Sequence, residues 1–109
     1  EDTYHGWESS IRRYIQSHLK KTVPRGTEAQ VTLYEFGRAA ESYKLDSGFN
    51  FGNEDLPKDV NGRMEMRFKQ GKSDFGISVQ LEQNPLTDED IRKGRTLKDM
   101  GYSLTIKPL

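Results

Sequence analysis

The chain has 109 residues, and its 17 basic and 17 acidic side chains cancel at pH 7. This length suits one domain, and because the charges are spread evenly they create no long-range field that would attract nucleic acid or a membrane. The chain has no cysteine, which excludes disulfides and thiolate metal sites and removes redox chemistry as a guide to the compartment.

We expect a flexible leader over residues 1–6 and a single domain over residues 7–109. Apolar residues make up 32% of the chain, below the roughly 45–50% of typical domains, a range that also counts glycine. The core must therefore be thin and suits a two-layer structure. The apolar runs are only a few residues long, so we expect no insertion into a membrane.

Residues 7–23 have the periodicity of an amphipathic helix. Its apolar residues fall on one stripe: Trp7, Ile11, Tyr14, Ile15, Leu19 and Val23. Pro24 and Gly26 end the helix, because proline cannot continue the backbone ladder and glycine permits a turn. Arg13 and Lys20 lie on the opposite arc, which either holds phosphates or stays solvated beside the helix dipole.

Two hairpins are expected after this helix. Residues 28–36 and 40–45 are rich in β-branched and aromatic residues and predict the first, with a turn at Gly37. Strict alternation over residues 63–82 predicts the second, which turns near Gly71. The apolar residues that alternate along the two strands are expected to share one face of this hairpin: Met64, Met66, Phe68, Phe75, Ile77, Val79 and Leu81.

Residues 84–106 predict a short helix and a last strand. Thr87 is a natural N-cap, and Asp90 stands at the acidic position of a capping box. Gly94 divides the segment into two short turns, and Ile91, Leu97 and Met100 are expected to face the core. Alternation over residues 102–106 then predicts a final strand.

The element order is therefore α-β-β-β-β-α-β, an α+β fold. We expect an antiparallel sheet of about five strands with the N-terminal helix packed on one face and a short second helix before the last strand. The strand order is open, and the last strand could pair with a strand that is not its neighbour in sequence.

The loop over residues 46–62 is a candidate partner-binding tip. It is longer than most connections and rich in glycine, asparagine and aspartate. Its candidate contact residues are Phe49, Phe51, Asn53, Glu54 and Asp55. Two phenylalanines could anchor a partner, or they could fold back over the thin core.

One face of the sheet is a candidate nucleic-acid surface. Aromatic rings for base stacking and cations for phosphates are what single strands require of a sheet. The candidates on the sheet are Arg63, Arg67, Lys69, Tyr34 and Phe36, with Arg13 and Lys20 of the helix as a second contact. Glu65 would repel phosphate there, and an ordinary ladder of paired charges is the alternative.

We identify no catalytic residue, metal site or cofactor motif. Asp59 and Asn61 resemble part of a calcium loop, but the other ligand positions are wrong. His18, on the apolar arc of the helix, could serve a small metal-independent nuclease or hydrolase, or be an ordinary boundary histidine. His5 lies in the leader.

The sequence favours a non-enzymatic interaction module. We expect it to bind a protein partner, or to self-associate as a homodimer, through a sheet edge and the 46–62 loop. Binding of nucleic acid on the sheet is the alternative, and an enzyme built around His18 is the third choice.

Overall fold

The computed structural model describes residues 3–46 and 48–109, and its main body is one helix packed on a five-stranded sheet. The helix α1 (Ser9–Thr22) precedes the hairpin β1 (Glu28–Glu35) and β2 (Arg38–Leu45). A 3₁₀ turn, η1 (Asn53–Asp55), precedes the second hairpin, β3 (Arg63–Gln70) and β4 (Ser73–Gln83). The short helices α2 (Asp88–Arg92) and α3 (Leu97–Met100) lead to β5 (Tyr102–Pro108). The predicted α+β class and element order are confirmed.

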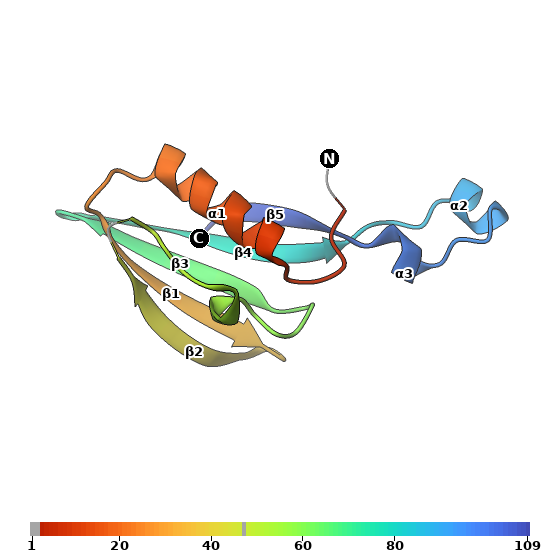
Figure 1. The fold of residues 1–109 in the computed structure, drawn as a ribbon, viewed down its shortest axis with the longest axis horizontal. Coiled ribbons are helices and arrows are strands. Elements are labelled where there is room, and N and C mark those ends of the chain that lie inside the picture. The colour runs from red at the N-terminus through yellow and green to blue at the C-terminus, as the bar shows by residue number, and fades with distance from the viewer. Residues whose placement is uncertain (1–2, 47) are drawn as a thin grey trace.

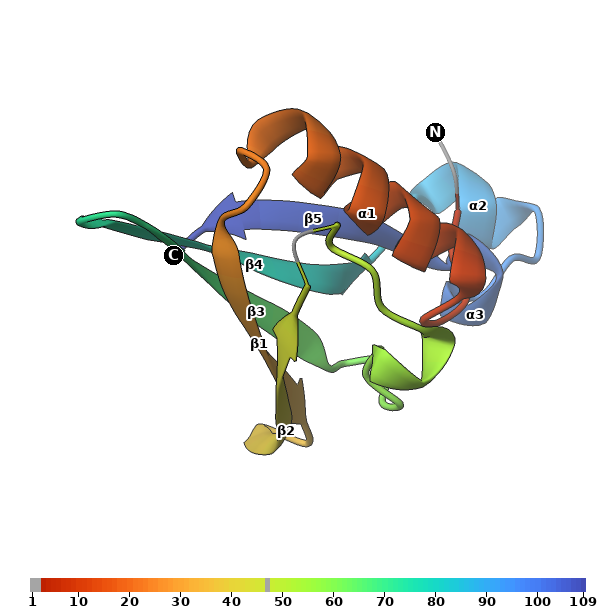
Figure 2. The ribbon, with the colours of Figure 1, turned by 60° about the vertical axis from the view of Figure 1, so that its left-hand side comes forward.

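All neighbouring strands are antiparallel, in the order β2-β1-β3-β4-β5. The last strand pairs with β4, its neighbour in the sequence, rather than with a distant strand. The strands β2 and β5 are the two edges. Figures 1 and 2 show α1 across one face of this open sheet, with the 46–62 loop on the same side.

The helix packs through residues spaced four apart. Ile11, Ile15 and Leu19 are fully buried, and burying side chains of this size contributes about 1.5–3 kcal/mol each. Val23 ends the helix with extended backbone before Pro24, because a residue before proline avoids the helical region. Tyr14 is half exposed, so its assignment to the buried stripe was wrong.

The sheet face beneath α1 carries the alternating residues of the second hairpin. Met64, Met66 and Phe68 are buried on β3, and their partners on β4 are Val79, Ile77 and Phe75. The predicted parity of this hairpin is therefore confirmed. The residues of opposite parity form the other face of the sheet, which we call the outer face.

The segment between β4 and β5 forms an arm, residues 84–101, that projects away from the body (Figure 1). The Thr87 capping box and the division into two short helices are confirmed. The expectation that Ile91 and Leu97 face the core was wrong, because both are more than half exposed. The arm lies beyond the end of the helix–sheet sandwich, where no second layer exists to cover them.

The N-terminal segment is paired with the last strand. The backbones of Tyr4 and Tyr102 exchange hydrogen bonds of 2.9 and 2.7 Å, and the Tyr4 side chain is buried. This part of the predicted leader is therefore packed against the domain. Within the described residues, no helix is long and apolar enough to cross a membrane.

Candidate functional site

The phenylalanines of the 46–62 loop are core residues. Phe49 is 2% exposed and Phe51 is 7% exposed, so neither is available as the surface anchor that we expected. The physical reason is the thin core: the loop folds back beside α1 and supplies apolar area that the strands and helix lack. The position of this loop agrees with the alternative interpretation, in which its two phenylalanines fold back over the core.

Polar contacts hold this loop against α1 and β2. The Arg12 side chain donates to Asn53 Oδ1 at 2.7 Å, and Gln16 Nε2 donates to the Phe51 carbonyl at 3.3 Å. The Tyr43 hydroxyl donates to the carbonyl of Asp55 at 3.1 Å. Burial raises the pKa of Tyr43 well above its usual value, which keeps this donor protonated. Of the five predicted partner-binding residues, Asn53 and Glu54 are exposed and Asp55 is half-buried.

The outer face brings some of the predicted nucleic-acid residues together. Tyr34 is the cross-strand partner of Arg63, whose guanidinium lies 3.9 Å from the ring centroid. Glu65 pairs with Arg63 at 3.1 Å and with Arg67 at 3.6 Å. A ladder of paired charges therefore occupies much of this face.

The remaining predicted residues are dispersed. Arg13 and Lys20 belong to α1, and α1 lies across the face of the sheet opposite to the outer face (Figure 2). Phe36 lies in the turn after β1 rather than in the strand, and it is 83% exposed. The predicted residues do not form one continuous surface.

The turn between β1 and β2 contains a strained aromatic residue. Phe36 and Gly37 are its two central residues, with φ of +52° and +77°. Two positive φ angles define a type I′ hairpin turn, in which asparagine followed by glycine is preferred. A bulky side chain with positive φ is uncommon and costs energy. This exposure could not be predicted from periodicity, which extended the strand through Phe36.

A pocket on the outer face gathers three cations near β2. It has a volume of about 520 Å³ and includes Lys44, Arg67 and Lys69 in its lining. Glu28 also lines it. Lys44 comes from the edge strand β2, and it lies near Arg67 because β1 alone separates β2 from β3 in the sheet, an order that local sequence patterns do not reveal.

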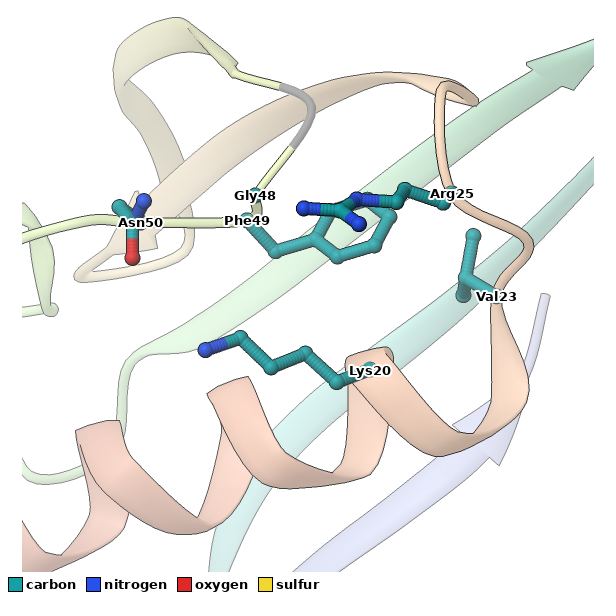
Figure 3. A pocket seen from close by; sticks show the side chains of 6 residues that line it. All are labelled: Lys20, Val23, Arg25, Gly48, Phe49 and Asn50. Carbon is teal, nitrogen blue, oxygen red and sulfur yellow. The ribbon is translucent and has the colours of Figure 1, made fainter.

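A second pocket lies between the end of α1 and the start of the 46–62 loop (Figure 3). It has a volume of about 450 Å³ and is lined by Lys20, Val23, Arg25, Gly48, Phe49 and Asn50. Lys20 and Arg25 are its only charged lining residues among those described. The periodicity of the helix places Lys20 on its polar arc, but only the packing of the loop against α1 brings Lys20 beside Gly48 and Phe49.

We find no arrangement of catalytic or metal-binding side chains among the described residues. No group of three or more histidine, aspartate or glutamate side chains is placed to hold a metal ion. His18 is half-buried on α1, and within residues 3–46 and 48–109 its one hydrogen bond with a side chain is at the backbone, where its carbonyl accepts from the Thr22 hydroxyl. No protein-family model, curated protein or solved structure matches this chain.

Proposed function

We propose that this chain is a non-enzymatic interaction module that binds an extended protein segment as a sixth strand along β2. The observation that carries the proposal is that β2 is an eight-residue edge strand whose first five residues are all exposed. Unpaired N–H and C=O groups on such an edge are a template for another strand. The 46–62 loop is not part of this proposed surface, because its phenylalanines are buried.

The other edge is less suited to strand addition. The backbone of Tyr4 already pairs with Tyr102 at the start of β5, and Pro108 at its end has no N–H to donate. Proline and local covering are common ways to block an edge. Within the described chain no backbone bridge blocks β2 in this way.

Phe36 supports binding at the β2 edge. It lies two residues before β2 and is the most exposed large apolar side chain in the described chain. Residues with strained backbone persist only where the surrounding structure holds them in place, and they are frequent at binding sites. A partner strand would cover both the β2 backbone and this ring.

The test selects binding peptides from a random display library and then maps where they bind on the ¹⁵N-labelled chain by ¹H–¹⁵N NMR. We expect selected peptides to shift amides of β2, and Phe36→Ser to weaken them. Tyr14→Ser is the matched control, because Tyr14 is also an exposed aromatic residue but lies on α1. Sedimentation across a concentration series distinguishes self-association. Shifts confined to other surfaces, or no binder together with a monomer throughout, would overturn the proposal.

A second candidate function is binding of single-stranded nucleic acid. It is favoured by the pocket that joins Lys44 to Arg67 and Lys69, because phosphates bind clustered cations. Fluorescence anisotropy with labelled oligonucleotides tests it. We expect salt-sensitive binding that Arg67→Gln weakens, and absence of binding at low salt would exclude this candidate.

A further inference from the structure

We propose that the pocket between α1 and the 46–62 loop binds a small organic dianion of the phosphate monoester class. We call it the Lys20–Arg25 pocket, and its lining residues are Lys20, Val23, Arg25, Gly48, Phe49 and Asn50. This site is separate from the β2 edge, so the proposal does not depend on strand addition.

Three segments of the chain converge on this pocket. Lys20 lies in the last turn of α1, and Arg25 follows in the turn before β1. Gly48, Phe49 and Asn50 come from the loop after β2. Figure 3 shows the side chains of Lys20 and Arg25 extending from two sides toward the same loop residues. The volume of about 450 Å³ lies in the range of small-molecule sites.

The charge of the pocket selects the ligand. Its lining contains two cations and no carboxylate, whereas the pocket on the outer face includes Glu28 beside its cations. Neither Lys20 nor Arg25 forms a salt bridge with another described residue. A phosphate monoester carries about two negative charges at neutral pH, so it would balance the two cations.

The polar geometry also suits a phosphate. A guanidinium presents a planar fork of donors, an ammonium acts as a compact charge, and an amide adds two donors. Arg25 supplies the fork and Lys20 the compact charge, and Asn50 brings its amide to the same lining, where the Asp46 carboxylate also accepts from it. The aliphatic stems of the two cations offer apolar surface for the organic part of the ligand, beside the small exposed part of Val23.

Hydrogen bonds to Asp46 tie together the loop residues that line the pocket. The Asp46 carboxylate accepts hydrogen bonds from the backbone N–H groups of Gly48 and Asn50, at 2.9 and 3.2 Å. The Asp46 carbonyl accepts from the N–H of Phe49 at 3.0 Å. The Phe49 ring is buried in the core, which fastens the loop beneath the pocket. A preorganised site loses less entropy when its ligand binds.

The test titrates phenyl phosphate, inorganic phosphate and phenol into the ¹⁵N-labelled chain. We expect phenyl phosphate to bind best, inorganic phosphate more weakly and phenol not at all, with amide shifts centred on Gly48 and Asn50. Lys20→Gln and Arg25→Gln should each weaken phenyl phosphate by about tenfold, because each removes one charged hydrogen-bond donor.

Lys21→Gln is the matched control. Lys21 is an exposed lysine in the same helix turn but does not line the pocket, so the affinity should stay within about twofold of the unsubstituted chain. Equal affinity for phenyl phosphate and inorganic phosphate would overturn the organic part of the proposal. Equal weakening by Lys21→Gln, or no shifts at Gly48 and Asn50, would overturn the site.

Discussion

The guanidinium of Arg63 lies 3.9 Å from the centroid of the Tyr34 ring, across the β1–β3 pair on the outer face. Arg63 is also neutralised by Glu65 at 3.1 Å. One face of the ring is therefore already covered by a cation. A nucleic-acid base could stack on that face only after displacing Arg63.

This contact should appear as a coupling free energy between Tyr34 and Arg63. In a double-mutant cycle with Tyr34→Ala and Arg63→Ala, we expect about 0.5–1 kcal/mol, the value of a partly exposed cation–π contact. Urea denaturation measures it. The control cycle combines Tyr34→Ala with Arg67→Ala, because the cross-strand partner of Arg67 is Gln30 and not Tyr34. Equal coupling in both cycles would contradict a specific ring contact.

Replacing Phe36 should stabilise the domain. Phe36→Asn puts the preferred residue at the first central position of a type I′ turn and relieves a strain of about 1 kcal/mol. We expect a higher urea midpoint and weaker binding of any peptide that adds to β2, since the exposed ring is lost. A lower midpoint would show that the ring stabilises the native hairpin.

Phe49 should be required for stability. Phe49→Ala removes a ring that is 2% exposed, which costs about 3–5 kcal/mol in a packed core. Since domains of this size are stable by only about 5–15 kcal/mol, the urea midpoint should fall sharply. Tyr14→Ala, at a half-exposed position, is the control. A small loss for both variants would place Phe49 at the surface.

The arm should open in acid before the sheet unfolds. The Thr87 hydroxyl donates to Asp90 at 2.6 Å and lowers the pKa of that carboxyl, and the Thr96 backbone N–H does the same for Asp99. Because the folded values lie below the ordinary value of about 3.9, both carboxylates stabilise the arm at neutral pH. This stabilisation is lost as the pH falls through the folded values.

Amide hydrogen exchange and NMR shifts of residues 88–100 measure the opening of the arm. Asp90→Asn should loosen the arm at pH 7 while the core amides keep their protection, because Ile91 and Leu97 are more than half exposed and do not belong to the core of the sheet and α1. Simultaneous loss of both regions would show that the arm and the sheet unfold as one unit.

Local sequence patterns predicted those helices and strands whose apolar side chains alternate or recur at a regular spacing. The parity of Met64, Met66 and Phe68 follows from the two-residue period of a strand, and the structure buries all three. Thr87 and Asp90 form the predicted capping box because its partners are only three residues apart. Such features depend on neighbours in the sequence, so the sequence suffices.

Tertiary structure alone decided which surfaces exist. Tyr34 meets Arg63, and Lys44 joins the pocket that holds Arg67, because β1 pairs with β3 and β2 is an edge. Burial of Phe49 depended on how much core the sheet and helix left uncovered. Strand parity tells which residues share a face but not which strands are adjacent, and loop burial depends on the summed area of distant elements. The sequence by itself therefore determined the elements and their apolar faces, whereas packing determined the edge at β2 and the Lys20–Arg25 pocket.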